Sequence, residues 1–235
     1  MNWIEQYPFI AHRGLHGKGV PENSELSFEQ AIKNNYAIEL DIQFLSDQTP
    51  IVFHDDNLLR MTGESCQVKN LNPVFLRHIR YQDGQRILTF ADCLKVVDAK
   101  VPLLIEVKND TYSKLGLNQL LKELSCYRGK YSIQSFNPQI LSYLNFKAPH
   151  ISIGQLKTDW GKTDLNFFKR NYLRFSEFYN DLSFISVDQK IISQFDLLIS
   201  KNKNIPLLTW TIKSSKDLLE VQSKCHGFIF EGFLP

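Results

Sequence analysis

Residues 36–55 read YAIELDIQFLSDQTPIVFHD, which is two strand-forming apolar runs joined by only five residues. A crossover between parallel strands needs about a dozen residues or more, so this connection predicts an antiparallel hairpin at about 37–55. The returning run, 50–55, therefore does not count among the parallel strands of the sheet. This decides how many parallel strands the rest of the chain supplies.

Eight parallel strands remain once the returning run is set aside. They are rich in β-branched and aliphatic residues, and most are continuously apolar, which is typical of parallel strands buried on both faces. Helix-forming stretches separate many of them, with Ser24 and Asn137 as expected N-caps. Strands that alternate with helices in this number predict an α/β fold, a (β/α)8 TIM barrel with the hairpin inserted after its second strand. The expected strands are 8–12, 36–44, 101–108, 130–136, 150–156, 183–188, 205–211 and 227–231, and the expected helices are 24–34, 90–98, 113–126, 138–144, 191–202 and 214–223.

The composition bounds the class of protein. The chain has 235 residues, 43% of them hydrophobic, which suffices for one sizeable core, and we expect a single domain over 1–235. A formal net charge of +2 gives no indication of a nucleic-acid partner. No run reaches the roughly 18 to 20 apolar residues that span a bilayer, which predicts no stable membrane insertion. The N-terminus lacks a signal-peptide pattern and the four cysteines are scattered, so we expect a cytoplasmic protein.

Acidic residues lie on two of the expected parallel strands. Glu39 and Asp41 are two residues apart, so their side chains share one face, and Glu106 shares a face with Lys108 by the same rule. Three carboxylates that converge at one end of a barrel repel each other unless a cation neutralises them. Oxygen ligands suit a hard divalent ion such as Mg²⁺ or Ca²⁺. The alternative is that these acids pair with arginine and lysine side chains.

Two histidines and two basic residues stand at the ends of expected strands. His12 and Arg13 end the first apolar run, and His54 ends the returning run of the hairpin. Histidine side chains suit general acid and base catalysis near neutral pH. The guanidinium of Arg13 matches phosphate geometry, and Lys108 adds a second positive charge. Together these groups indicate a site for a phosphate oxyanion.

Several of these residues fall in recognisable motifs. The segments IAHRG (10–14), PENS (21–24), IELDIQ (38–43), VFHDDNLLRMTG (52–63) and IEVK (105–108) resemble those of the glycerophosphodiester phosphodiesterase family, in the superfamily of phosphoinositide-phospholipase-C-like phosphodiesterases. The closing segments TWT (209–211) and HGFIFEGFLP (226–235) are also similar to that family's. The resemblance implies a (β/α)8 barrel with one divalent cation that hydrolyses small glycerophosphodiesters to glycerol 3-phosphate and an alcohol.

The resemblance also implies a role for each matching residue. His12 and His54 would be the catalytic pair, and Glu39, Asp41 and Glu106 would bind the metal. Arg13 and Lys108 would hold the phosphate, and Glu22 and Asn23 would shape the edge of the pocket. For Trp210 the residue type itself leads us to expect packing on the glycerol, with a place in the core as the alternative. The sequence departs from the family at Asp47-Gln48-Thr49, where the hairpin turn usually has Asp-Gly, and at Lys213 and Glu231, where Asn and Asp are usual. The last two departures are expected to retune the leaving-group pocket.

Alternatives stay open at this point. A lysophospholipase D or a phospholipase-C-like phosphodiesterase would use the same barrel, and a non-catalytic barrel would bind a phosphorylated ligand with the same groups. The pattern does not choose between Mg²⁺ and Ca²⁺, between the two histidines as base, or between water and the glycerol 2-hydroxyl as nucleophile. The leaving alcohol and the oligomeric state are also open. Asp55 is expected to orient His54 or to cap a turn, and the aromatic residues of 158–182 are expected to pack in the core, with a lid or a weak membrane contact as the alternative.

Overall fold

The computed structural model describes residues 3–159, 161, 173 and 180–235 of the chain. The described residues fall into two compact units, one formed by Met1–Ile10 with Ser132–Pro235 and the other by Ala11–Tyr131. We call them the 132–235 unit and the 11–131 unit. The expected aromatic core residues of the segment 158–182, namely Phe167, Phe168, Tyr172, Phe175 and Phe178, lie outside the described residues.

The strands have the connectivity of a (β/α)8 barrel, as the sequence predicts. Their hydrogen-bonded order is β1-β9-β8-β7-β6-β5-β4-β2-β3, with a further pairing between β1 and β2. The pairings β2–β4, β5–β6, β6–β7, β7–β8 and β8–β9 are all parallel. In the described part of the chain, helices separate most of these strands. β1 (Phe9–Ala11) and β5 (Tyr131–Ser135) begin in one unit and end in the other.

The 11–131 unit contains the segment that decides the strand count. β2 (Ala37–Phe44) is buried at every position and pairs in parallel with β4 (Leu103–Val107). On its other edge it pairs antiparallel with β3 (Pro50–Val52), with Ile42 opposite Val52. The helices of this unit are α2 (Glu25–Lys33), α3 (Leu59–Thr62), α4 (Pro73–Leu76), α5 (Phe90–Val97) and α6 (Lys114–Leu124), with a 3₁₀ turn η1 (Val68–Asn70).

The turn between β2 and β3 closes without the glycine that is usual in such turns. Gln48 adopts the left-handed conformation, with φ of 73°. The carboxylate of Asp47 accepts hydrogen bonds from the backbone amide and the hydroxyl of Thr49, at 3.0 and 2.9 Å. Such a hydrogen bond from a side chain to the residue two positions later stabilises a turn. The backbone amide of Gln48 also donates to the carbonyl of Leu45 at 2.9 Å. The departure at Asp47-Gln48-Thr49 therefore changes the turn chemistry and keeps the hairpin.

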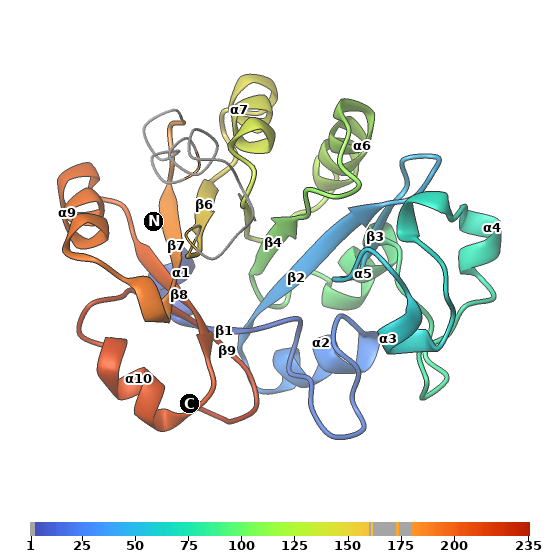
Figure 1. Cartoon of the computed structure of the whole chain (residues 1–235), viewed down its shortest axis with the longest axis horizontal. Helices are drawn as coiled ribbons and strands as arrows, with labels where there is room; N and C mark the ends of the chain where they lie inside the picture. The colour runs from blue at the N-terminus through green and yellow to red at the C-terminus, as the bar shows by residue number, and fades with distance from the viewer. Residues whose placement is uncertain (1–2, 160, 162–172, 174–179) are drawn as a thin grey trace. The chain divides into compact units, whose positions relative to one another are not determined.

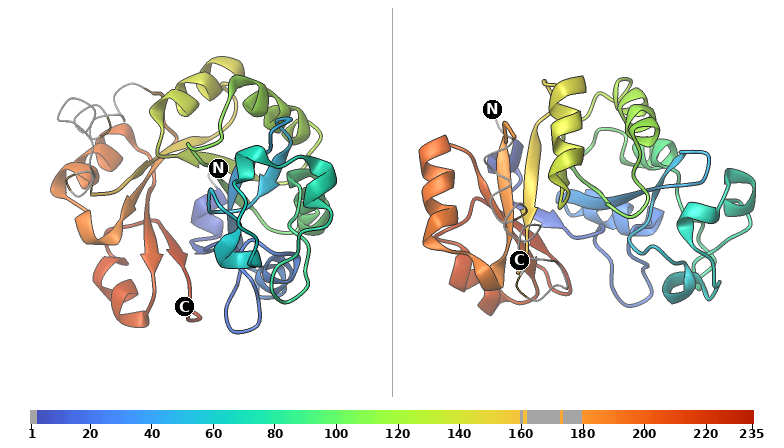
Figure 2. Two further views of the ribbon diagram at one scale, coloured as in Figure 1. Left: turned by 45° about the vertical axis from the view of Figure 1, so that its right-hand side comes forward. Right: turned by 45° about the horizontal axis from the view of Figure 1, so that its top comes forward.

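Helix packing positions α2 and α5 within the 11–131 unit. Helices α2 and α5 pack against each other, α2 also contacts β2, and α5 contacts β3 (Figures 1 and 2). Ser24 caps α2 as expected, with its side chain accepting from the backbone amide of Ser27.

The connecting segments after β3 contribute side chains to a buried apolar cluster, which holds these segments in place. This cluster contains Leu45, Ile51, Phe53, Leu58, Val68, Leu71, Leu76, Ile79, Tyr81 and Ile87.

The 132–235 unit repeats the strand–helix pattern. Besides the parts of β1 and β5 that it contains, the strands among its described residues are β6 (Ile153–Lys157), β7 (Phe184–Asp188), β8 (Leu207–Ile212) and β9 (Gly227–Phe230). The helices among the same residues are α1 (Trp3–Gln6), α7 (Pro138–Lys147), α9 (Gln194–Lys203) and α10 (Ser215–Val221), with a 3₁₀ turn η4 (Gln189–Ile191). Asn137 caps α7 as expected, with Pro138 in its first turn. Helices α9 and α10 both pack against β8 (Figure 1). None of the helices in the described part of the chain combines the length and hydropathy that a bilayer crossing requires.

Candidate active site

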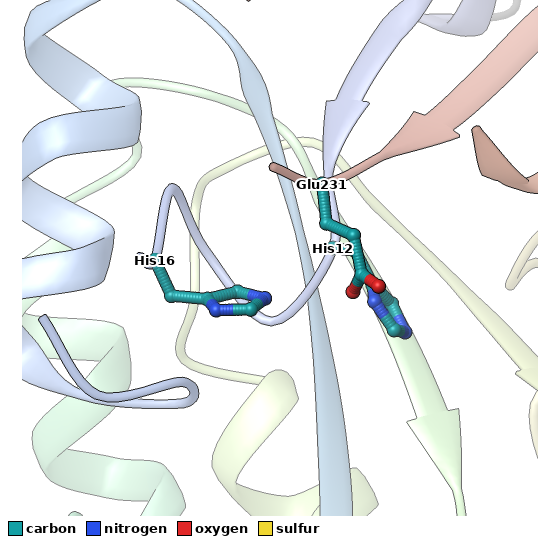
Figure 3. A group of neighbouring side chains, drawn as sticks. All are labelled: His12, His16 and Glu231. Carbon is teal, nitrogen blue, oxygen red and sulfur yellow. The ribbon is translucent and has the colours of Figure 1, made fainter. Parts of the chain in front are cut away.

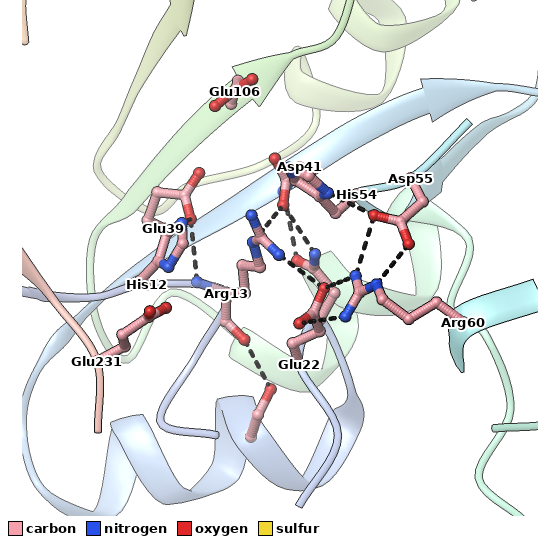
Figure 4. A network of polar contacts seen from close by, with 12 residues as sticks. His12, Arg13, Glu22, Glu39, Asp41, His54, Asp55, Arg60, Glu106 and Glu231 are labelled. Atoms are coloured by element: carbon pink, nitrogen blue, oxygen red, sulfur yellow. Dashed lines mark hydrogen bonds and ion pairs between the residues drawn. The ribbon is translucent and has the colours of Figure 1, made fainter. Parts of the chain in front are cut away.

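Three acidic side chains predicted to lie together do so within the 11–131 unit. The parallel register of β2 and β4 sets Asp41 directly opposite Glu106, and Glu39 lies two residues earlier on the same face of β2. One ligand atom from each of these residues lies within 4.8 Å of the other two. All three are buried, at 2%, 1% and 8% exposure for Glu39, Asp41 and Glu106. Figure 4 shows them along the two strands.

The carboxylates of the cluster have different electrostatic environments. Burial raises the pKa of Glu39 well above its ordinary value, and the negative charges of Asp41 and Glu106 raise it further. Burial also raises the pKa of Asp41, but the positive charges of Lys108 and then Arg13 outweigh burial, so this pKa lies below its ordinary value. A further positive charge would therefore stabilise the carboxylate of Glu39 more than that of Asp41.

Lys108 directly follows the last residue of β4, and its side chain contacts the acidic cluster. Its ammonium Nζ lies 2.7 Å from Glu106 Oε1 and 3.5 Å from Asp41 Oδ1. Burial lowers the pKa of Lys108, yet the negative charges of Glu106 and Asp41 raise it above its ordinary value. The acids therefore do both things that the sequence left open: they cluster with one another, and two of them also pair with the basic side chain of Lys108.

The donor set of this cluster fits a divalent cation. Glu39, Asp41 and Glu106 offer hard oxygen ligands from two adjacent strands, and their mutual repulsion at Glu39 is what a bound cation relieves. The same oxygens suit Mg²⁺ and Ca²⁺ alike. Charge and ligand type therefore support one divalent ion here without choosing between the two metals.

A tight turn after β1 places Arg13 against the acids. Arg13 and Gly14 have φ of 53° and 77°, and a Cβ at Gly14 would meet the side chain of Ser27. In this conformation the backbone amide of Arg13 donates to Glu39 Oε2 at 3.0 Å. Its guanidinium Nε lies 3.3 Å from Asp41 Oδ2. The turn thus directs both the main chain and the side chain of Arg13 toward β2.

His12 lies at the start of this turn. Its Nε2 is 4.0 Å from Glu39 Oε2, and its side chain is 17% exposed. The ring of His16 lies farther along the same loop, with its centroid 6.4 Å from that of His12 (Figure 3). Glu231, which Figure 3 also labels, belongs to the 132–235 unit, where it pairs with Lys213 at 2.7 Å. The two departures from the family pattern in the tail therefore contact each other.

His54 is held from two sides. The backbone amide of Phe53 donates to the carbonyl of Asp41 at 3.0 Å, which fixes the end of the hairpin to β2. The Nδ1 atom of His54 lies 2.7 Å from Asp55 Oδ1, so Asp55 contacts the ring in the way that the expected orienting role requires. Burial raises the pKa of Asp55, but hydrogen bonds with Arg60 and His54 lower it below its ordinary value. An ionised Asp55 only accepts, so the neutral His54 ring carries its hydrogen on Nδ1.

Asn23 is a buried partner of Asp41. Its Nδ2 donates to Asp41 Oδ2 at 2.9 Å, and the backbone amide of Asp41 donates to Asn23 Oδ1 at 3.3 Å. The carbonyl of Asn23 accepts from the hydroxyl of Tyr81 at 3.2 Å. Asn23 is fully buried and has φ of 54°. Its contacts therefore orient Asp41.

Glu22 contacts two arginines, one of which sequence reasoning missed. It accepts from Arg13 Nη1 at 2.8 Å and from two nitrogens of Arg60 at 3.1 and 2.6 Å. Burial raises the pKa of Glu22, whereas the bonds from Arg60 and the charge of Arg13 lower it below its ordinary value. Arg60 lies inside the segment VFHDDNLLRMTG, six residues after His54, and this proximity to a candidate catalytic residue was the available signal.

Trp210 belongs to the 132–235 unit. Its ring packs edge-to-face against Phe136, with centroids 5.6 Å apart, and its Nε1 donates to the carbonyl of Ser186 at 3.3 Å. Among the residues predicted for the site, the 11–131 unit brings together all except Trp210. These are His12, Arg13, Glu22, Asn23, Glu39, Asp41, His54, Glu106 and Lys108.

Comparison with known proteins finds one family. The model of the glycerophosphoryl diester phosphodiesterase family matches residues 12–231. YhdW of Bacillus subtilis, named as a candidate glycerophosphodiester phosphodiesterase, is 29% identical over 231 residues, which cover 91% of this chain and 89% of that protein. The glycerophosphodiester phosphodiesterase of Caldanaerobacter subterraneus is 32% identical over 162 residues, or 63% of this chain and 65% of that protein.

Solved structures share the fold at low identity. A phosphodiesterase of Oleispira antarctica, solved in complex with the product sn-glycerol-3-phosphate, matches with a TM-score of 0.79 at 18% identity, covering 95% of this chain and 92% of that chain. A glycerophosphodiester phosphodiesterase from Thermotoga maritima matches with a TM-score of 0.73 at 19% identity, covering 95% and 94%. At these identities the likeness is one of fold.

Proposed function

The chain belongs to the glycerophosphoryl diester phosphodiesterase family, and we propose that it hydrolyses glycerophosphodiesters to glycerol 3-phosphate and an alcohol. The relatives named above for this reaction support the reaction class. We also propose that the chain acts as a single domain, since the family match runs through both compact units without a break. The substrate is then a small molecule that carries one phosphodiester.

One observation carries the proposal. Within the 11–131 unit, three buried carboxylates share one face of β2 and β4, and a lysine and an arginine lie among them. His12 lies 4.0 Å from this cluster, and His54 follows directly after the residue that is hydrogen-bonded to Asp41. Folding alone does not require so many ionisable groups in one buried place, because each costs desolvation free energy. Phosphodiester hydrolysis uses all of these groups.

The metal would be held by Glu39, Asp41 and Glu106. When bound there, a divalent cation supplies positive charge that polarises the phosphoryl group and offsets the charge of the transition state. Arg13 and Lys108 add the cationic side chains that bind the non-bridging phosphate oxygens. Without substrate, these two side chains contact carboxylates of the cluster. When substrate binds, its phosphate oxygens would replace those carboxylates as the anionic partners.

His12 and His54 would move the protons. One histidine takes a proton from the nucleophile and the other gives a proton to the leaving alcohol. The contact with Asp55 keeps the hydrogen of neutral His54 on Nδ1, which leaves Nε2 for exchange with the substrate. The roles of base and acid, and the choice between water and the glycerol 2-hydroxyl as nucleophile, are for experiment.

The remaining predicted residues would shape the pocket. Asn23 orients Asp41 and Glu22 holds the guanidinium of Arg13, and both lie in the loop that leads into α2. We propose that this loop forms the edge of the pocket. Trp210 is proposed to pack on the glycerol moiety, a role that suits a flat apolar ring with one polar atom.

Release of glycerol 3-phosphate tests the proposal. Glycerophosphocholine, glycerophosphoethanolamine and glycerophosphoglycerol are each incubated with Mg²⁺, Ca²⁺ or EDTA, in parallel with the His12→Ala variant. We expect turnover that requires a cation and that is lost in the variant, and the three rates rank the leaving alcohols. Lysophosphatidylcholine and phosphatidylinositol are included as further substrates. Turnover of these alone would replace the proposal with a lysophospholipase D or phospholipase C activity, and no turnover at all would leave a binding function.

A further inference from the structure

Arg60 bridges two carboxylates in the 11–131 unit. Its Nε lies 2.6 Å from Asp55 Oδ2, and its Nη2 lies 3.0 Å from Asp55 Oδ1. Its Nη1 and Nη2 donate to the two oxygens of Glu22 at 3.1 and 2.6 Å. One planar guanidinium thus engages all four oxygens of two acids (Figure 4). This is the fork geometry in which arginine differs from lysine.

Each of these carboxylates leads to a different part of the site. Asp55 Oδ1 lies 2.7 Å from His54 Nδ1, and Glu22 Oε1 accepts from Arg13 Nη1 at 2.8 Å. The result is a continuous chain of contacts from His54 through Asp55, Arg60 and Glu22 to Arg13. Arg60 is the central member, and it lies 38 positions after Glu22 in the sequence.

The ion pairs of Arg60 are expected to contribute little to the free energy of unfolding. The side chain of Arg60 is 49% exposed, and ion pairs at such positions typically contribute only about 0 to 1 kcal/mol to stability. Helix α3, which carries Arg60, is one turn long, and its apolar neighbour Leu58 supplies the buried contact. What the guanidinium fixes is the orientation of two acids whose other partners are a candidate catalytic histidine and a candidate phosphate-binding arginine.

We propose that Arg60 is a positioning residue that couples the two halves of the site, holding Asp55 so that His54 keeps its hydrogen on Nδ1 and holding Glu22 against Arg13. Its effect on turnover rests on the proposed function, whereas its effect on the His54 ring does not. A single Asp–His contact leaves Asp55 free to rotate about its side-chain bonds. The contact of Asp55 with the guanidinium of Arg60, which is itself held by Glu22, removes that freedom.

Three variants separate this role from charge and from stability. Arg60→Met removes the fork and keeps the aliphatic stem, and Arg60→Lys keeps the charge without the geometry to engage both acids. The matched control is Arg86→Met, because Arg86 lies in the same unit, is 53% exposed and pairs with Glu25 and Asp92 at 3.9 and 3.6 Å. All three variants are expected to unfold at nearly the wild-type temperature.

The first measurement is the tautomer of His54, from the ¹⁵N signals of its ring at mildly alkaline pH. His54→Gln assigns the signals by their loss. Wild type and Arg86→Met are expected to show hydrogen on Nδ1, while Arg60→Met and Arg60→Lys are expected to show a mixture of the Nδ1-H and Nε2-H forms, as Asp55→Asn does. A His54 ring in Arg60→Met that still carries its hydrogen on Nδ1 alone would overturn the coupling.

The second measurement is the rate of glycerophosphodiester hydrolysis. Loss of a residue that orients a reacting group typically costs about 10- to 100-fold in activity, so kcat of Arg60→Met is expected to fall by this factor, and Arg60→Lys is expected not to restore it. Full recovery in Arg60→Lys would reduce the role of Arg60 to its charge and overturn the proposal. If wild type hydrolyses no phosphodiester while the tautomer shifts as expected, the proposed function fails and the positioning role stands.

Discussion

The ammonium of Lys108 lies 2.7 Å from the carboxylate of Glu106, two residues earlier on the same face of the chain. This contact makes Lys108 an internal counter-ion of the acids that are proposed to bind a metal. Because the two positive charges would share the same oxygens, the lysine and the cation are expected to compete for them. The acids and the lysine are therefore best tested together.

Replacing Lys108 with Met is expected to strengthen the response to a divalent cation. Without cation, loss of this buried partner leaves Glu106 and Asp41 less compensated, and the free energy of unfolding should fall by about 3 kcal/mol. Added Mg²⁺ or Ca²⁺ should then raise the melting temperature more in this variant than in wild type. Differential scanning fluorimetry measures both effects, with the exposed Lys95→Met as the control. An equal rise in the two proteins would show that Lys108 does not compete with the ion.

Substitutions at Asn23 are expected to separate a backbone effect from a side-chain effect. Asn23→Ala and Asn23→Gly both remove the hydrogen bond to Asp41. The free energy of unfolding should fall by about 1 to 3 kcal/mol in both variants, because the buried carboxylate of Asp41 loses a hydrogen-bond donor. Only the glycine variant relieves the positive φ of this position. Urea unfolding should therefore show the alanine variant to be the less stable one. Equal stabilities would mean that the backbone conformation carries no cost here.

Gly14 and Gly19 form a matched pair for the turn that carries Arg13. Both have positive φ, at 77° and 76°, but a Cβ at Gly14 would meet Ser27, whereas a Cβ at Gly19 would meet nothing within 4 Å. Alanine at either position should cost about 1 kcal/mol for the backbone, and Gly14→Ala should lose further stability and most of its phosphodiesterase activity. Unfolding curves and initial rates test this. Similar activities in the two variants would show that the turn tolerates the displacement.

A buried ion pair in the 132–235 unit predicts a pH dependence of stability. Lys157 Nζ lies 2.7 Å from Asp196 Oδ1. Burial raises the pKa of Asp196, but its hydrogen bonds with Lys157 and Ser193 lower it below its ordinary value. A carboxyl whose pKa is depressed by folding stabilises the protein above the unfolded pKa of about 3.9, and this contribution is lost as the pH falls through the lower, folded value.

Asp196→Asn should therefore be less stable than wild type at neutral pH, with a difference that shrinks as the pH falls below about 4. Thermal unfolding across this range gives the comparison. Asp98→Asn is the control, because Asp98 is 72% exposed and its left-handed conformation suits asparagine equally well. A constant difference between Asp196→Asn and wild type at every pH would remove the ion pair as its cause.

The main elements could be predicted from the sequence because their signals are local. Apolar runs of strand length, helix caps at Ser24 and Asn137, and the short connection at 45–49 each act over a few residues, and the structure has these elements within a few residues of the predicted bounds. The shared face of Glu39 and Asp41 follows from the two-residue period of a strand in the same way. The one-turn helices α1, α3 and α4 were missed, since a single turn leaves no periodic pattern to detect.

Tertiary structure decided which of these residues contact each other. The register of β2 and β4 sets Asp41 opposite Glu106, 65 residues later, and no local pattern specifies that register. Arg60 meets Glu22 only because the segment after β3 packs on its own apolar cluster and returns toward the turn after β1. By itself the sequence determined the kinds of chemical group at each strand end, through spacing and side-chain type. Their pairing, and with it the balance of charge among the acids, depended on packing between segments far apart in the chain, which local patterns do not encode.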